Sequence, residues 1–360
     1  MTISRFSARA LTESVRIVGD ARPNFLKDFV FSPGSMHPTD VIDFGKMQVV
    51  ARVATYQRPG GPAIVVNKST ADAKTVRAPK IREKIVFDEN FAEVLNAALP
   101  GYKGPFGTDR NAQIPAKVAT EQQKLRNRIE RAIELQCAQA LTTGTITLTF
   151  ADGTTATISL EFTGDGATTG NTLTIQPDLS GTEMFTASGS DPLGYIESRG
   201  DQIRDNSDYN GPLNVILGSS AWAAFRKNKA IMAQLDNRRV ESGTLKTSFD
   251  AAFKGSIDGF NFYKYVNGYV NSSGTRVQAW PGGIMVIMPP QDAGKTTIEY
   301  GAVYDRPSKD EQARYIQTDY FSKMIAEGED PPVDELIVES RPLALIKDPS
   351  AIRVCQVCAN

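Results

Sequence analysis

The sequence contains one histidine and three cysteines among 360 residues, so it has few of the side chains on which catalysis and metal binding usually depend. His37 stands beside two prolines in SPGSMHPTD and is predicted to be a turn residue rather than a general base. Cys355 and Cys358 form Cys-Gln-Val-Cys, but a zinc site needs two further ligands and Cys137 is distant in the sequence. We interpret the pair as two positions near a terminal strand, and we predict no catalytic residue, metal or cofactor.

An excess of charge and long apolar runs are also missing. The sequence has 40 Lys and Arg residues against 41 Asp and Glu, a formal net charge of −1, so nothing overall draws it to nucleic acid or to an anionic membrane. No run approaches the length of a membrane span, and no N-terminal stretch is typical of a secretory signal, which predicts synthesis in a reducing cytoplasm. The hydrophobic fraction of 41% predicts a folded globular protein.

The stretch AGKTT, with Gly294-Lys295-Thr296, is the one most typical of an enzyme, because Gly-Lys-Thr ends the phosphate-binding P-loop. The first glycine of that motif is replaced by Pro289, which has no N–H to offer a phosphate. The residues that follow, TTIEYG, alternate like a strand, whereas a P-loop enters a helix. We therefore predict a turn between two strands and no enzyme, and a nucleotide-binding enzyme at this turn remains the alternative from another functional class.

Residues 1–44 are predicted to form an N-terminal arm. An amphipathic stretch over 7–18 precedes Pro23 and FLKDFVF, in which Phe25, Leu26, Phe29 and Phe31 form an apolar cluster. Two alternatives are open for this cluster. It packs either on the core of its own chain or on a neighbouring subunit, and we expect it at a subunit interface.

Residues 45–87 are predicted to form a long extended hairpin. Two alternating segments flank Arg58-Pro59-Gly60-Gly61-Pro62, where two glycines between prolines favour a reversal of the chain. A long hairpin is only marginally stable in water, so another copy of the protein is expected to support it. The basic residues would set the register of that contact more than its affinity; they are Arg52, Arg58, Arg77, Lys80 and Arg82.

Residues 116–142 give the clearest helical pattern of the sequence. Leu125, Ile129 and Ile133 recur four apart, charges such as the Arg126–Glu130 pair are placed on the other face, and Gly144 follows the end. This long helix would be the spine of a domain over residues 88–192. A hairpin follows, with its turn at Asp152-Gly153, and residues 163–192 read as loops around a short strand, LTI.

Residues 193–325 are predicted to form a separate, inserted α/β domain. A buried strand at Val215-Ile216-Leu217 leads into a helix that Ser219 or Ser220 would cap. Residues 326–360 alternate again and are expected to return to the spine-helix domain. Four basic residues of this helical stretch, which runs on to 239, have two open interpretations, a solvated helix face or ion pairs with carboxylates of a neighbouring subunit; they are Arg226, Lys229, Arg238 and Arg239.

Three groups of residues carry a resemblance to a known family. They are Trp222-Ala223, Phe225-Arg226, Lys229-Ala230 and LDNRR at 235–239; Glu299-Tyr300-Gly301 with Asp305 and 312–314; and SRPLAL at 340–345 with Asp348-Pro349. With these groups in this order and spacing, and with FLKDFVF and VRAPKIREK upstream, the chain resembles the major capsid proteins of lambda-type tailed bacteriophages, the capsid protein E family. The resemblance covers about residue 25 to the end, apart from 163–192, which has no clear counterpart.

The resemblance implies an α+β protein with the Hong Kong 97 type capsid fold. That fold has an N-terminal arm, an extended loop hairpin, a peripheral domain with a long spine helix, and an inserted axial domain. It implies a major capsid protein whose copies form pentamers and hexamers of an icosahedral shell around double-stranded phage DNA. The shell would be assembled in the host cytoplasm and become part of the virion.

The resemblance also implies partners. These are other copies of the chain, a portal, possibly a decoration protein, and DNA bound weakly and without sequence specificity. Fewer than fifty residues precede the hairpin, too few for a fused scaffolding domain, so a separate scaffolding protein or none is expected. No membrane partner is expected. A nanocompartment shell of the same fold, which encloses protein cargo, is the alternative within the structural class.

Overall fold

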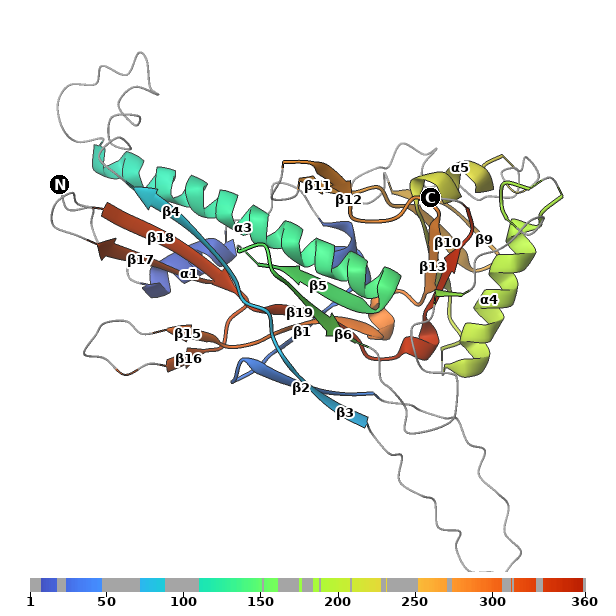
Figure 1. The fold of residues 1–360 in the computed structure, drawn as a ribbon, viewed down its shortest axis with the longest axis horizontal. Helices are drawn as coiled ribbons and strands as arrows, with labels where there is room; N and C mark the ends of the chain where they lie inside the picture. Colours follow the sequence, from blue (N-terminus) through green and yellow to red (C-terminus); the bar gives the residue numbers. More distant parts are fainter. Residues whose placement is uncertain are drawn as a thin grey trace, which may run out of the picture.

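The computed structural model describes most of the chain and is organised around one long helix. The described residues are 8–17, 24–46, 72–87, 110–150, 152–160, 175–176, 184–187, 189–207, 209–227, 231, 252–270, 274–305, 312, 314–327 and 333–358. The long helix, α3 (Arg110–Thr143), runs diagonally across the molecule, with β4, β17 and β18 near its N-terminal end and a six-stranded sheet near its C-terminal end (Figure 1).

The predicted spine helix is confirmed and is longer than expected. It spans 34 residues and begins at Arg110, before Pro115. Its apolar stripe is fully covered, since Leu125, Ile129 and Ile133 are all 2% exposed or less, and each such side chain contributes about 1.5–3 kcal/mol of burial free energy. The helix ends where expected, because Gly144 adopts a left-handed φ of 66° and donates its N–H to the carbonyl of Ala140.

Two three-stranded sheets pack around this helix. One has the order β17-β18-β4 and is antiparallel throughout; the other has the order β1-β14-β19, in which β1 is parallel to β14. Together with α3 they enclose the larger hydrophobic core. The strands are β4 (Ile81–Phe87), β17 (Phe321–Glu327) and β18 (Val333–Ser340), and β1 (Ser32–Met36), β14 (Thr296–Tyr300) and β19 (Pro342–Ile346).

The N-terminal segment lies on this core rather than away from it. Helix α1 (Ala8–Ile17) and a short π-helix, η1 (Leu26–Val30), precede β1. Phe25, Leu26 and Phe31 are 7%, 0% and 0% exposed, and Phe29 packs against the same core. The cluster therefore packs on the core of its own chain, which was one of the two alternatives, and a contact between the partly buried Phe29 and a neighbouring subunit stays a prediction.

The base of the predicted hairpin is present. β2 (Val41–Lys46) pairs antiparallel with β3 (Asp72–Arg77), from Val41 opposite Arg77 to Lys46 opposite Asp72. The hairpin starts four residues earlier than the predicted 45, and residues 81–87 leave it to form β4. Arg52, Arg58, Gly60 and Gly61 lie outside the described residues.

A second ribbon follows the spine helix as predicted. β5 (Thr145–Thr149) pairs antiparallel with β6 (Thr155–Ser159). The turn is at Asp152-Gly153, where the Asp152 carboxylate accepts the N–H of Thr154 at 2.9 Å.

The inserted α/β unit contains a six-stranded sheet of order β7-β20-β13-β8-β10-β9. Helices α4 (Pro192–Asn206) and α5 (Ser219–Phe225) pack on one face of it, and the other face belongs to the core of the spine helix. Gly218 rather than a serine side chain precedes α5, so the predicted serine cap is wrong. The strands are β7 (Ile175–Gln176), β8 (Leu213–Leu217), β9 (Phe253–Ile257), β10 (Phe260–Lys264), β13 (Ile284–Met288) and β20 (Arg353–Gln356).

The sheet order changes the predicted domain limits. We call α3 and the two three-stranded sheets packed on it the spine-helix unit. β14 and β17 lie within the predicted 193–325 domain, but they pair with other strands of the spine-helix unit. β18 and β19 pack on the spine helix, whereas β20 belongs to the six-stranded sheet. Each unit is therefore built from segments distant in sequence, because strand pairing and burial of apolar faces decide the partners.

Two small ribbons and two short 3-10 turns complete the described elements. β11 (Gly268–Val270) pairs with β12 (Arg276–Gln278), and β15 (Val303–Asp305) pairs with β16 (Arg314–Ile316), in each case as a separate two-stranded sheet. The turns are η3 (Gln291–Ala293) and η4 (Pro349–Ala351).

Candidate assembly surfaces and the joints that hold them

Asp40 joins the hairpin to the body of the protein. Its carboxylate accepts the Nε–H of Arg77 at 2.7 Å and lies 3.1 Å from Nη1 of Arg341, while its backbone carbonyl accepts the N–H of Ala78. The hydrogen bond from Arg77 is the largest cause that holds the pKa of Asp40 below its usual 3.8, and burial opposes it. One carboxylate thus links the start of β2, the end of β3 and the chain beside β19.

Gly301 allows this close approach. A side-chain carbon at this position would lie 2.8 Å from the side chain of Ala78, so no larger residue fits without a shift. Its N–H also bonds to the carbonyl of Arg341. Gly301 is the glycine of the Glu-Tyr-Gly motif, and this close approach explains why a residue without a side chain stands at that position.

The charge network continues from this joint onto β4. Nε of Arg341 lies 3.6 Å from Glu339, which also pairs with Lys80 at 3.3 Å and Arg82 at 3.8 Å. The side chains of Lys80 and Arg82 remain 41% and 44% exposed, so the energy of each exposed pair is small. The structure therefore brings three predicted residues, Arg77, Lys80 and Arg82, to one network, and their described partners are carboxylates of the same chain.

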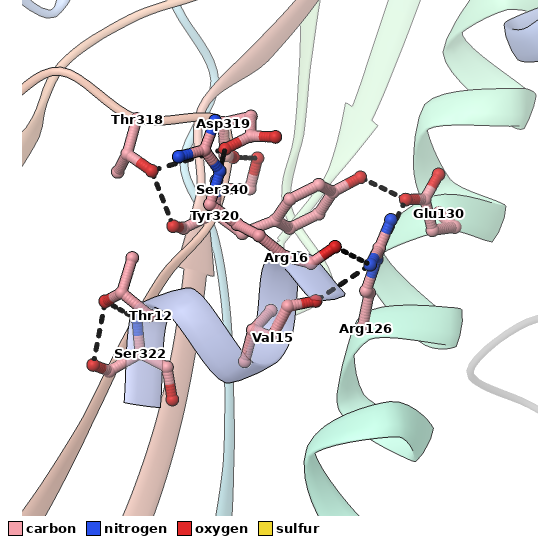
Figure 2. Close-up of polar contacts among 10 residues, drawn as sticks. All are labelled: Thr12, Val15, Arg16, Arg126, Glu130, Thr318, Asp319, Tyr320, Ser322 and Ser340. Atoms are coloured by element: carbon pink, nitrogen blue, oxygen red, sulfur yellow. Dashed lines mark hydrogen bonds and ion pairs between the residues drawn. The ribbon is translucent and has the colours of Figure 1, made fainter. Parts of the chain in front are cut away.

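A second joint holds α1 on the spine helix and on β17, and Figure 2 shows its contacts. Thr12 donates its hydroxyl to the carbonyl of Ser322 at 3.2 Å and accepts the N–H of Ser322 at 3.1 Å. Arg126 of the spine helix donates Nη1–H bonds to the carbonyls of Val15 and Arg16. These carbonyls lie in the last turn of α1, so the cation of Arg126 interacts favourably with the negative end of the helix dipole.

Glu130 is buried at the centre of this joint. Its side chain is 1% exposed and lies within bonding distance of the Tyr320 hydroxyl and of the Lys27 ammonium, with Nε of Arg126 at 3.4 Å. We predicted the Arg126–Glu130 pair for the outer face of the helix, and this is wrong. A buried carboxylate requires such partners because its desolvation is costly.

Glu134, one turn further along α3, holds the start of η1. Its two oxygens accept the N–H groups of Leu26 at 3.0 Å and Lys27 at 2.9 Å, and the Tyr265 hydroxyl donates to it at 2.6 Å. Burial is the largest cause that raises the pKa of Glu134, and these hydrogen bonds oppose it. The spine helix thus presents a cation to the end of one short helix and a carboxylate to the beginning of another.

Exposed aromatic residues on the β15–β16 ribbon were missed by the sequence analysis. Tyr304 and Tyr315 lie opposite each other, with ring centroids 5.6 Å apart, and are 48% and 52% exposed. At the loop end of the ribbon the buried Asp305 pairs with Lys323 of β17 at 2.9 Å, which ties the ribbon to that strand. An isolated two-stranded ribbon is marginal in water, so its exposed tyrosines form a surface suited to a partner.

The basic residues predicted on the helix after β8 are only partly described, since α5 ends at Phe225. Arg226 is exposed at the end of α5, and Lys229, Arg238 and Arg239 lie outside the described residues. Neither of the two interpretations of these residues is therefore decided.

The AGKTT stretch forms the predicted turn. It joins η3 to β14, a strand rather than a helix. The ammonium of Lys295 pairs with Asp348 at 2.8 Å, and the hydroxyl of the buried Thr296 donates to the carbonyl of Val30 at 3.0 Å. Both groups that would contact a nucleotide phosphate are thus bound to the chain itself.

The three cysteines and the single histidine lie within or beside the secondary-structure elements of the fold. Cys355 lies in β20 and Cys358 just after it, and both are free and buried, as is Cys137. His37 follows β1 and lies 3.2 Å from Glu299. Across the described part of the chain no group of three or more His, Cys, Asp or Glu residues could hold a metal ion, and no helix there is long and apolar enough to cross a membrane.

Comparison with solved structures shows the fold. A protein assigned as a prophage capsid protein of E. coli CFT073 superposes with a TM-score of 0.63 at 15% identity, covering 99% of this chain and 100% of that chain. A phage-related protein of Bordetella bronchiseptica RB50 gives a TM-score of 0.49 at 12% identity, covering 98% of both chains. The capsid of cyanophage P-SCSP1u gives 0.47 at 11% identity, covering 95% of this chain and 92% of that chain.

Comparison of the sequence with family models gives the family. No curated protein sequence matches the chain. The model of phage major capsid protein E matches residues 7–357, nearly the whole chain. Together with the Hong Kong 97 type fold, this match identifies a structural protein of the virion shell: the chain belongs to the phage major capsid protein E family.

Proposed function

We propose that copies of this protein associate into pentamers and hexamers that close into an icosahedral shell around packaged double-stranded DNA. The family match over residues 7–357 carries this proposal. The base of the hairpin and the exposed tyrosines of the β15–β16 ribbon support it, because the first is bound to the body of the subunit through Asp40 and the second leaves two aromatic side chains open to a partner. Rigid, exposed elements lower the entropy cost of association.

The proposed shell uses each surface differently. The hairpin lies over the spine-helix unit of the next subunit, and the six-stranded unit faces the local symmetry axes, where Arg226 meets carboxylates of a neighbour. Arg52 and Arg58 set the register of the hairpin contact. A separate scaffolding protein, a portal and a decoration protein are further proposed partners, and contact with DNA is weak and independent of sequence.

Electron microscopy of the purified recombinant protein, together with size-exclusion chromatography, tests the proposal. Uniform shells, tubes or rings of five and six subunits are the expected result. A protein that stays monomeric at every salt and protein concentration, and also in the presence of the products of the neighbouring genes, would contradict it. Nuclease-resistant DNA inside shells recovered from infected cells is expected; shells that hold only protein would instead indicate a nanocompartment.

The tyrosine pair gives a specific prediction for assembly. Replacing both Tyr304 and Tyr315 with serine is expected to leave the subunit folded and to weaken each ribbon contact by about 30-fold, which corresponds to the loss of ~2 kcal/mol at an interface hot spot. Light scattering against protein concentration measures the change in the assembly threshold. The double Tyr→Phe variant keeps the aromatic area and is the matched control. Equal thresholds for the serine and wild-type proteins would exclude the ribbon as a contact.

A further inference from the structure

The spine helix separates its charges by sign. The three described glutamates of α3 are buried, with Glu121 8%, Glu130 1% and Glu134 1% exposed. Lys124, Arg128 and Arg131 are exposed. The buried carboxylates are used inside the subunit, so the face that α3 presents to solvent carries cations.

The three cations form one line along the helix. They are separated by four and three residues, which places them on the same face at steps of about 6 Å and 4.5 Å along the axis. Lys124 pairs with Glu121 at 2.8 Å, and Arg128 pairs with Glu83 of β4 at 3.1 Å. Arg131 makes no ion pair with any residue that the structure describes. The line therefore keeps a net positive charge, which is reduced at two of its three positions.

The surroundings of this line favour a charged polymer over a protein partner. Large exposed hydrophobic residues occur on several strands and loops, but within the described part of the chain none lies on α3. A protein interface normally has an apolar centre, whereas binding to a phosphate backbone requires mainly cations that displace counterions. The straight line of cations on a helix fits a straight, regularly charged ligand.

We propose that this face of α3, defined by Lys124, Arg128 and Arg131, binds the phosphodiester backbone of duplex DNA and is the surface turned toward the packaged genome. The proposal rests on the proposed function and adds which side of the subunit faces inward. Three cations per subunit give weak binding without base recognition, and many copies in one shell add their contributions by avidity.

The salt dependence of DNA binding by unassembled subunits tests the proposal. Fluorescence anisotropy with a labelled duplex, over a series of salt concentrations, is expected to give a slope of log K against log salt that includes about −0.9 from Arg131 and up to about −2.7 from the three cations together. Arg131→Gln is expected to reduce the magnitude of the slope by about 1, and the triple variant K124Q/R128Q/R131Q by up to about 3. Arg276→Gln, which removes an exposed cation of β12, is the matched control and leaves the slope unchanged.

Three outcomes overturn the proposal. The first is an unchanged slope in the triple variant, and the second is an equal loss in Arg276→Gln. The third is retention of poly-glutamate without binding of duplex DNA, which would indicate an acidic protein partner. Electron microscopy of the same variants distinguishes failure of this proposal from failure of the proposed function. Variants that form normal shells and keep an unchanged slope refute only the DNA-facing surface. A wild-type protein that forms no shell under any condition refutes the shell itself.

Discussion

Replacing Glu130 with alanine is expected to lower the free energy of unfolding of the subunit by about 3–5 kcal/mol. The change removes the described carboxylate within bonding distance of the Tyr320 hydroxyl and takes one partner from two largely buried cations, Lys27 and Arg126, whose side chains are 14% and 13% exposed. Lys27 keeps Asp28 at 3.5 Å and Arg126 keeps the carbonyls of Val15 and Arg16, but breaking a buried ion pair by removing one partner is strongly destabilising. Urea-induced unfolding of the unassembled subunit measures the effect.

Two control variants test whether the loss of stability comes from removing a buried carboxylate rather than from removing any glutamate. Glu13, an exposed glutamate of α1, gives a Glu13→Ala variant that is expected to change stability by less than about 0.5 kcal/mol. Glu130→Gln keeps an acceptor for Tyr320 and is expected to fall between the alanine variant and the wild type. A loss below about 1 kcal/mol in Glu130→Ala would show that Lys27 and Arg126 reach water without this carboxylate.

Replacing Asp40 with asparagine is expected to leave a folded subunit that assembles at least about tenfold less well, which corresponds to ~1.4 kcal/mol of lost interface energy. Without the carboxylate, neither Arg77 nor Arg341 holds the root of the hairpin, so the hairpin samples directions that do not reach the next subunit. The yield of shells in sedimentation measures the effect. Asp43→Asn, at an exposed aspartate of β2 whose partner is the Thr75 hydroxyl, is the matched control.

The same variant predicts a change in the response to acid. The pKa of Asp40 is lowered in the folded protein, so its contribution to stability is fully present above its ordinary pKa of 3.8 and is lost as the pH falls through the lower folded value. The wild type is therefore expected to lose stability below pH 3.8 more steeply than Asp40→Asn, as measured by thermal unfolding over a pH series. Parallel curves for the two proteins would contradict the ion-paired state of Asp40.

The sequence pattern predicted those elements whose formation depends on residues close together in the sequence. The spine helix was found because Leu125, Ile129 and Ile133 repeat with the period of a helix, and the turn after η3 was found because Pro289 cannot serve a P-loop. The limits of the two units were not found, because β14, β17 and β20 select partners by burial against distant strands. Nothing in the sequence near these strands specifies those partners.

The candidate surfaces were predictable to a smaller extent. Arg77, Lys80 and Arg82 were predicted for a contact with another subunit, which stays a prediction. Their described partners are Asp40 and Glu339, and the latter is more than two hundred residues away in the sequence. Glu130 was placed outside because a charged residue on an amphipathic helix is usually solvated. Only the three-dimensional arrangement shows that Lys27 and Tyr320 reach it.

The position of β20 also determines when the six-stranded sheet can close during synthesis. This strand, residues 353–356, lies between β7 and β13 inside the sheet, although it follows every other described strand in the sequence. Domains often fold on the ribosome in the order in which they are made. Here β7 cannot join the sheet, and β13 keeps one unpaired edge, until residues 353–356 have been made. A nascent chain that lacks β20 therefore exposes an unpaired strand edge, which the completed sheet covers.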